Sequence, residues 1–248
     1  MLVGDTTGAS DTPGGSDTTG VSHDSSESGA VSGSRDSDET ATSLFPRVIE
    51  TERLRLEPRT REYVEPLRCY EVCSTAVDGI EDVTRWLPWE PHDQPEVSAE
   101  FLDRGERYWE SGEVAAYAIR PREGEPGAGE IAGFGGLSCD WEHHRGSLGL
   151  WLRKPFWGRG YSGERATALV ELAFDRLGLE TVFVTHEHRN EKSQSAIERY
   201  VDRLGGRRDG TLRNELTYAD GSVHTEVAYS IHREEWLAAT DGGTDVLK

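Results

Sequence analysis

The stretch Trp157-Gly158-Arg159-Gly160-Tyr161-Ser162-Gly163 decides how this chain is interpreted. It follows an alternating apolar segment from Leu148 to Leu152, and it precedes an amphipathic helix pattern that starts at Glu164. Glycine lets a backbone come close to a ligand, and the free N–H groups at a helix N-terminus attract anions. The sequence therefore predicts a strand, a glycine loop and a helix start that together bind a phosphate group.

The chain is strongly acidic. Its 248 residues include 46 Asp and Glu against 27 Lys and Arg, a formal net charge of −19. A nucleic-acid surface needs clustered positive charge, so this balance argues against a nucleic-acid partner. Repulsion between carboxylates is screened in concentrated salt. We therefore expect a halophilic protein, with an ordinary acidic protein as the alternative.

Cysteine usage and hydropathy bear on the compartment. Cys69, Cys73 and Cys139 contain no Cys-x-x-Cys pair, which favours a reducing environment. Cys69 and Cys73 lie four residues apart on an expected helix and are interpreted as apolar packing residues. No apolar run reaches the length of a membrane span, and the N-terminus lacks a signal-peptide pattern. We expect a cytoplasmic protein with no membrane partner.

Three regions differ in composition. Residues 1–43 are rich in Gly, Ser, Thr and Asp and lack aromatic side chains, so we expect a disordered acidic tail. Residues 44–240 alternate between strand and helix patterns, which predicts one mixed α/β (α+β) domain. Residues 241–248 are expected to form a flexible C-terminus.

The apolar spacing predicts the elements of this domain. Helices are expected over 61–78, 95–111, 164–177 and 190–205. Strands are expected over 50–57, 114–120, 130–138, 147–153 and 181–185, followed by two closing strands around a turn at 219–222.

The glycine loop also matches Gly-x-Gly-x-x-Gly, a dinucleotide-binding fingerprint in which Glu187 could hold a ribose. That fingerprint belongs at the start of a βαβαβ unit. Here several strands and helices precede the loop, and the pattern after it soon becomes an antiparallel hairpin. A dinucleotide-dependent oxidoreductase is therefore a weak hypothesis for this chain.

Several segments in order resemble the GNAT N-acetyltransferases of the RimJ/RimL type, which act on ribosomal-protein N-termini. The segment 151–164 resembles the acyl-CoA loop of that family. The other matching segments are Glu50-Thr51-Glu52-Arg53-Leu54-Arg55-Leu56, Leu87-Pro88-Trp89, Asn190-x-x-Ser193 and Tyr229-Ser230-Ile231 with Glu235-Trp236. The resemblance implies the GNAT acyl-CoA N-acyltransferase fold. That fold has a mixed central sheet of about seven strands, splayed strands 4 and 5, and helices on both faces.

The same resemblance implies an acetyl-CoA-dependent N-acetyltransferase, in which an amine attacks the thioester directly. Acetyl-CoA is then the donor substrate, and the acceptor is a protein N-terminus or a small amine. The implied cofactor-binding residues are Leu150, Trp151, Leu152, Arg153, Gly158, Arg159, Gly160, Tyr161, Ser162, Gly163, Asn190 and Ser193.

Four cations, Arg153, Lys154, Arg159 and Arg165, surround the loop in a chain that is otherwise poor in positive charge. They favour a polyanionic cofactor. The alternative is that they only pair with surface carboxylates, which is common and contributes little to stability.

The chemistry needs an acid for the leaving thiolate and a base for the amine. Ser193 matches the family position of the acid, with a plain helix-start serine as the alternative, and Asn190 could be only an N-cap. The strand glutamate of many members is replaced here by Ser147 and Gly149. The remaining candidate bases are Glu142, His144, His186 and Glu187.

Two further expectations concern partners. His186 and His188 share a strand face, but no third ligand has convincing spacing, so no metal is expected. The missing strand glutamate keeps open a non-catalytic acyl-CoA-binding sensor or partner module of the same fold. A monomer and a homodimer are both consistent with the sequence.

Overall fold

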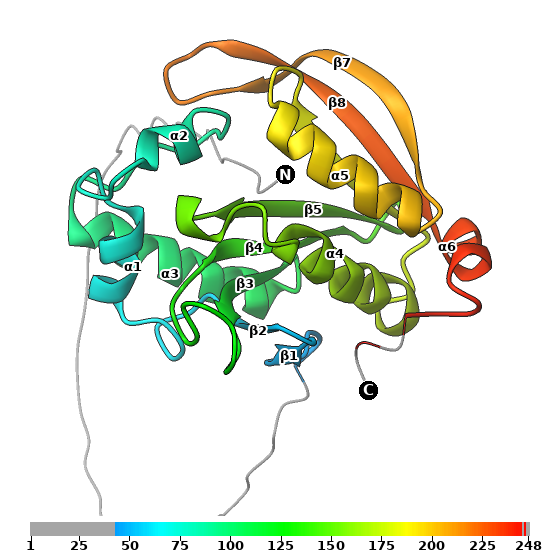
Figure 1. Cartoon of the computed structure of the whole chain (residues 1–248), viewed down its shortest axis with the longest axis horizontal. Coiled ribbons are helices and arrows are strands. Elements are labelled where there is room, and N and C mark those ends of the chain that lie inside the picture. The colour runs from blue at the N-terminus through cyan, green and yellow to red at the C-terminus, as the bar shows by residue number, and fades with distance from the viewer. Residues whose placement is uncertain (1–42, 245, 247–248) are drawn as a thin grey trace, which may run out of the picture. The chain divides into compact units, whose positions relative to one another are not determined.

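The computed structural model describes residues 43–244 and 246. The expected disordered tail therefore lies outside the described residues apart from Ser43, and so does part of the expected C-terminal segment. The described domain is built on one eight-stranded sheet with the order β1-β2-β3-β4-β5-β6-β8-β7 (Figure 1). No helix among residues 43–244 is both long enough and apolar enough to span a bilayer.

The sheet is antiparallel except between β5 and β6, which confirms the expected mixed α/β class. The strands are β1 (Ile49–Glu50), β2 (Leu54–Pro58), β3 (Val114–Pro121), β4 (Gly133–Asp140), β5 (Arg145–Leu152), β6 (Thr181–Glu187), β7 (Arg207–Thr217) and β8 (Val223–His232).

The sheet contains eight strands rather than about seven because the expected first strand is divided. Thr51 closes a tight turn with Leu54, whose carbonyl accepts a hydrogen bond from the Thr51 N–H at 2.9 Å. The Thr51 hydroxyl in turn accepts one from the Leu54 N–H at 3.0 Å. This turn separates β1 from β2, and the expected alternation survives only in β2.

The helices are α1 (Pro66–Cys73), α2 (Ile80–Thr84), α3 (Pro95–Ser111), α4 (Tyr161–Glu171), α5 (Glu191–Arg203) and α6 (Arg233–Ala239). A widened turn over Leu172–Arg176 extends α4. The expected helix over 61–78 is shorter in the structure because Pro66 fixes its first turn and Ser74 adopts an extended conformation. The helix expected over 95–111 is present and ends at Gly112.

Helices cover both faces of the sheet (Figure 1). On one face, Leu169 of α4 and Val201 of α5 belong to the apolar core that includes Leu148 of β5. On the other face, Val72 of α1 and Leu102 of α3 belong to a second apolar cluster with Phe134 of β4 and Trp151 of β5. The junction between β5 and β6 therefore lies between two helical layers, and this junction organises the candidate site.

Candidate active site

The sheet opens where β5 and β6 separate. These parallel neighbours pair only as far as Leu148 and Val184, although β5 continues to Leu152. An unpaired strand edge offers N–H and C=O groups to an extended ligand. The expected cofactor-binding residues Leu150, Trp151 and Leu152 lie on this part of β5.

The glycine loop and the start of α4 follow the open end of β5. Gly158 and Gly160 have φ values of 75° and 80°, in the left-handed region that favours glycine. Gly160 precedes the first residue of α4, Tyr161. Among the described residues, no backbone group accepts a hydrogen bond from the N–H groups of Gly158 to Ser162. Free N–H groups at a helix start are the geometry of a phosphate-binding site.

A carboxylate fixes the helix start to the turn between β1 and β2. Glu164 Oε1 accepts hydrogen bonds from the Thr51 hydroxyl at 2.5 Å and from the Arg53 N–H at 2.7 Å. Glu164 Oε2 accepts one from Arg53 Nε at 2.8 Å. Arg53 Nη1 also donates to the Arg159 carbonyl at 2.9 Å. Two motifs that are more than 100 residues apart therefore hold the loop together.

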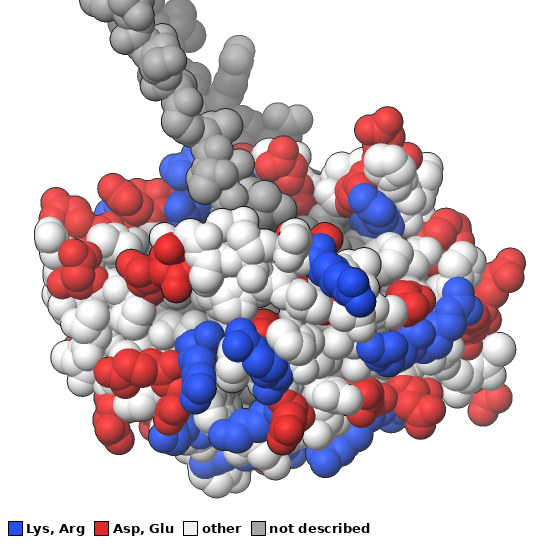
Figure 2. Space-filling view, turned by 90° about the horizontal axis from the view of Figure 1, so that it is seen from above, with Lys and Arg blue, Asp and Glu red and all other residues white. Residues whose placement is uncertain are grey.

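The expected cations divide into two groups. Lys154 forms an ion pair with Asp82 at 2.5 Å, and Arg153 forms one with Glu130 at 3.1 Å. Arg159 instead donates to the Pro126 carbonyl at 2.9 Å. Figure 2 shows Lys and Arg side chains gathered in the lower half of the view from above. Surface pairing therefore accounts for two of the four cations and leaves the other two for a different role.

Arg165 lies at the point where β5 and β6 separate. Its Nη1 donates to the carbonyl of Gly149, the first residue of β5 beyond the pairing with β6, at 3.1 Å. The side chain is 2% exposed, and burial lowers the pKa of its guanidinium to about 10. Its Nε has no hydrogen-bond partner among the described residues. The sequence placed Arg165 among the cations around the loop, for a polyanionic cofactor or, as the alternative, for surface pairing, but in the structure it is a buried, charged donor to β5.

The start of α5 approaches the glycine loop. Lys192 Nζ lies 4.4 Å from the centre of the Trp157 ring. Asn190 Oδ1 accepts a hydrogen bond from the Ser193 N–H at 3.1 Å, so Asn190 is the N-cap of α5. The contact through Lys192 brings the segment that carries Asn190 and Ser193 to the loop, as a shared cofactor site requires.

Two candidate bases lie away from this opening. Glu142 and His144 are exposed in the turn that precedes β5. The first residue of β5, Arg145, pairs with the first residue of β6, Thr181, so this turn is at the closed end of the junction. The opening begins beyond Leu148. The structure therefore does not bring Glu142 and His144 together with the other candidates, because they lie at the opposite end of β5.

His186 is buried under α5 near the open end of β6. Its Nδ1 lies 2.8 Å from the Glu187 carbonyl, and its Nε2 lies 3.3 Å from the Tyr229 hydroxyl. The Tyr229 hydroxyl also lies 3.2 Å from Glu198 Oε1. Glu198 is exposed on α5, so these three side chains connect a buried imidazole to solvent.

Glu187 is buried and already engaged. It accepts hydrogen bonds from the Arg189 N–H and from Arg189 Nε, both at 2.7 Å, and His188 and His224 lie within 3.5 Å of it. Burial opposes ionisation, but the hydrogen bonds from Arg189 outweigh it and hold the pKa of the Glu187 carboxyl below its usual range. Such a carboxylate is a weak base, which reduces its fit to the role expected from the sequence.

Two polar groups beside Glu187 were missed by sequence reasoning. Glu226 lies directly opposite Glu187 in the sheet and is 5% exposed. Its Oε2 and the Tyr218 hydroxyl have no hydrogen-bond partner among the described residues. An unpaired buried carboxylate is costly, so this position favours a donor such as an ammonium group. In the sequence, Glu226 is only a glutamate within the predicted closing strand. The strand register is what places it opposite Glu187.

Known proteins resemble this chain in sequence and in fold. An acetyltransferase (GNAT) domain description matches residues 53–200, more than half of the chain. The relatives include Bacillus subtilis (strain 168) YdaF, provisionally named a ribosomal N-acetyltransferase. It is 31% identical over 109 residues, which cover 44% of this chain and 57% of YdaF. An Aspergillus fumigatus FsC-acetyl coenzyme A-N(2)-transacetylase is 33% identical over 97 residues, covering 38% of each chain.

The matched segments thus span less than two thirds of the length of these relatives. Among solved structures, the microcin C7 self-immunity acetyltransferase MccE in complex with acetyl-CoA and AMP has a TM-score of 0.63 at 18% identity. The likeness covers 77% of this chain and 98% of that one, and it supports the fold alone. With the matched domain covering the loop, the open strand edge and most of α5, the chain belongs to the GNAT acetyltransferase family.

Proposed function

We propose that this chain is an acetyl-CoA-dependent N-acetyltransferase that acetylates a primary amine, nearest in type to the RimJ/RimL branch. The observation that carries the proposal is the set of free N–H groups from Gly158 to Ser162 beside the unpaired edge of β5. The free N–H groups suit a pyrophosphate, and the unpaired strand edge suits an extended pantetheine arm. Acetyl-CoA contains both groups and therefore fits the junction.

The donor is held mainly by backbone. The loop N–H groups bind the pyrophosphate, and Arg159 adds a charge that forms no ion pair with a described carboxylate. Leu150 to Leu152 receive the pantetheine arm, and the start of α5 with Asn190 and Ser193 forms the other wall. An N–H on the open β5 edge polarises the acetyl carbonyl as negative charge develops on its oxygen.

The reaction is direct transfer. The neutral amine nitrogen attacks the thioester carbon, the C–S bond breaks, and the Ser193 hydroxyl gives its proton to the leaving thiolate. Ser193 then regains a proton from solvent. We assign the base to His186, whose ring faces α5 on the side of the sheet opposite Glu187 and Glu226. The amine proton therefore reaches it around the open end of β6, and the contacts through Tyr229 to Glu198 offer a route onward to solvent.

The acceptor side suits a cationic amine. Glu226 has an unpaired carboxylate oxygen, and an ammonium group supplies three donors. This feature favours an amine that binds as the cation and loses its proton before attack. A protein N-terminus and a small amine share that chemistry, so both remain in the acceptor class.

One observation favours a second candidate, an acyl-CoA-binding sensor or partner module. Glu187, the carboxylate at the end of β6, is fully used by Arg189 and its histidine neighbours. If His186 does not act as a base, the same fold binds the donor and performs no chemistry.

Two experiments separate these functions. Calorimetric titration of the full chain with acetyl-CoA and with NADH, in low and in molar salt, tests the donor, and selective binding of NADH overturns the proposal. Release of free CoA thiol is then followed over a panel of amines and N-terminal peptides. We expect Ser193→Ala to lower kcat at least about tenfold, with a much smaller change in acetyl-CoA affinity because the loop backbone and the β5 edge remain. Acetyl-CoA binding without thiol release across the panel favours the sensor.

A further inference from the structure

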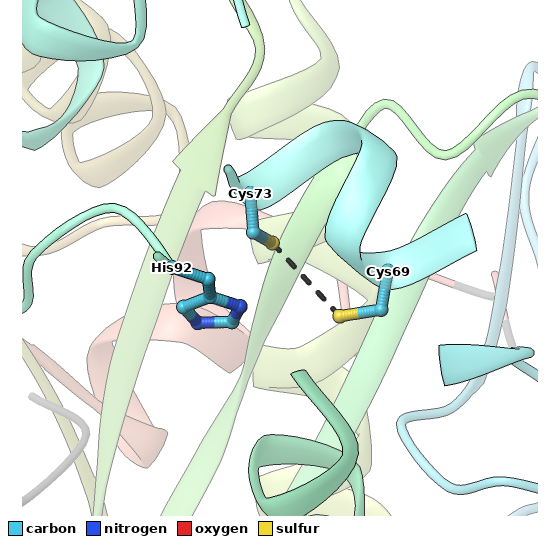
Figure 3. Close-up of side chains that lie close together, drawn as sticks. All are labelled: Cys69, Cys73 and His92. Atoms are coloured by element: carbon cyan, nitrogen blue, oxygen red, sulfur yellow. Dashed lines mark hydrogen bonds between the residues drawn. The ribbon is translucent and has the colours of Figure 1, made fainter. Parts of the chain in front are cut away.

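Two thiols and an imidazole converge on the sheet face opposite α4 and α5. Cys69 and Cys73 lie one turn apart on α1, and the His92 ring, from the segment before α3, faces them (Figure 3). One ligand atom from each residue lies within 4.8 Å of the other two, and all three side chains are buried. The sequence predicted only packing for the cysteines, because nothing in it places His92 beside them.

The spacing of the two sulfur atoms matches a shared metal ion. Zinc–thiolate bonds of about 2.3 Å at a tetrahedral angle place two sulfurs about 3.8 Å apart. Cys69 Sγ and Cys73 Sγ are 3.9 Å apart. Two cysteines and a histidine are a common zinc ligand set. A hydrogen bond between two neutral thiols has similar spacing, so a metal-binding measurement must distinguish a zinc site from a hydrogen-bonded thiol pair.

A buried cation lies near the two thiols. Arg59 is 2% exposed, interacts electrostatically with both cysteines, and has no hydrogen-bond partner for Nε or Nη2 among the described residues. A buried guanidinium without an acceptor is costly, and metal binding would deprotonate both thiols beside it. A Zn²⁺ ion and two thiolates sum to zero charge, so the bound ion adds no net positive charge near Arg59, whose guanidinium lies 4.0 Å from the centre of the Phe101 ring.

A buried hydroxyl contacts the histidine of this cluster. The Ser98 hydroxyl, in the first turns of α3, lies 2.7 Å from His92 Nδ1 and is fully buried. It can orient the imidazole as a neighbour of a metal ligand does, or hold a water on the ion. The ion would then connect α1, the segment before α3, and α3 itself.

We propose that Cys69, Cys73 and His92 bind one Zn²⁺, a structural site separate from the acyl-transfer junction. Binding releases the two thiol protons to solvent and forms two Zn–S bonds and one Zn–N bond, with no change in oxidation state. The site supports the packing beneath Trp89, whose ring lies 5.8 Å from that of His92 and 5.1 Å from that of Trp151 on β5.

The test uses the full chain, expressed with Zn²⁺ in the medium and kept reduced. Elemental analysis is expected to give one Zn per chain. After the metal is removed with a chelator, Co²⁺ is expected to give thiolate-to-cobalt charge-transfer absorption and tetrahedral d–d bands, which Zn²⁺ then abolishes. Zn²⁺ is also expected to raise the melting temperature of the chelated protein.

Variants assign the signal to the cluster. Cys73→Ser and His92→Asn should each remove the charge-transfer band or weaken Co²⁺ binding at least about tenfold. Cys139→Ser, the third cysteine, which lies outside the cluster, should leave the spectrum unchanged. If the folded parent chain carries no Zn and gives no charge-transfer band, the thiols are a packed pair and the proposal fails. That result holds even where a cysteine variant does not fold.

Discussion

The donor side and the acceptor side that we propose for the β5–β6 junction are built differently. The donor side consists mainly of one continuous segment, from the open edge of β5 through the glycine loop to Glu164, and it offers mostly backbone groups. The acceptor side consists of side chains from separate segments, including Glu187 of β6, Glu226 of β8 and Tyr218 of the hairpin between β7 and β8. Arg189 adds a link to the segment after α2, since its guanidinium lies 5.1 Å from the centre of the Trp86 ring.

This difference explains why the donor could be predicted and the acceptor could not. Backbone geometry at a loop and a helix start follows from local residue types, above all from glycine at positive φ. A pocket of side chains depends on strand register and on which segments meet. Four variants test this difference, beginning with the one expected to change binding most.

Gly160→Asp should damage the donor side most. Aspartate tolerates the left-handed φ of 80° better than most residues, but it adds a negative charge where the pyrophosphate would bind. We expect the Kd for acetyl-CoA to rise about 100-fold, equivalent to about 2.7 kcal/mol. Gly178→Asp, at a φ of 66° with open space around the added carbon, is the matched control. Equal acetyl-CoA affinity of the two variants would contradict a phosphate site at this loop.

Glu187→Gln should destabilise the acceptor side by about 2 kcal/mol at pH 7, because the charged hydrogen bonds to Arg189 are lost. The folded-state pKa of Glu187 is below its ordinary value. Its stabilisation is therefore present above an unfolded-state pKa of about 4.3 and is lost as pH falls through the folded-state value.

Chemical denaturation at pH 7 and below pH 4 checks this sign. The difference in the free energy of unfolding between the parent and Glu187→Gln should become smaller at low pH. Glu180→Gln, at an exposed position just before β6, is the control and should have little effect at either pH. A gap that stays constant with pH would mean that Glu187 is not stabilised as the carboxylate.

Glu226→Gln should weaken acceptor binding without touching the donor. It keeps the side-chain shape but removes the charge, so we expect the KM for the amine to rise about tenfold, equivalent to about 1.4 kcal/mol. The Kd for acetyl-CoA should not change. Glu215→Gln, exposed on β7, is the control. A parallel loss of acetyl-CoA binding would show that Glu226 is structural.

Lys192→Met should have the smallest effect. It removes the cation over Trp157, where α5 approaches the loop. A contact of this kind contributes about 0.5–1 kcal/mol, so we expect acetyl-CoA affinity to fall by about two- to fivefold. Lys192→Arg should restore most of it. If neither variant changes the affinity, the approach of α5 contributes nothing to donor binding.

Much of the fold followed from local patterns. Gly112 ended α3, Asn190 capped α5, and the alternation in β8 was predicted with its turn. The errors occurred where a long-range contact overrode the pattern. The expected first strand is divided by the Thr51 turn, whose neighbours bind Glu164 from α4.

The candidate site divides in the same way. The loop from Trp157 to Gly163 was identified from its residues, and its free N–H groups are where the pattern predicts them. In contrast, nothing in the sequence showed that Arg165 turns inward to Gly149, or that Glu142 lies at the closed end of the junction. Those outcomes depend on how β5, β6 and α4 pack together.

Local residue types were enough to predict the class of fold and an anion-binding loop, because glycine conformations, helix starts and apolar periods act over a few neighbouring residues. The resemblance to the GNAT acetyltransferases then indicated acetyl-CoA as the donor. Only the tertiary structure decided which charges are buried and what they face. It placed Glu226 opposite Glu187, and His92 beside Cys69 and Cys73. The free energy of a charge or a metal ligand depends on groups brought together from distant segments, and such groups are defined only once the chain has folded.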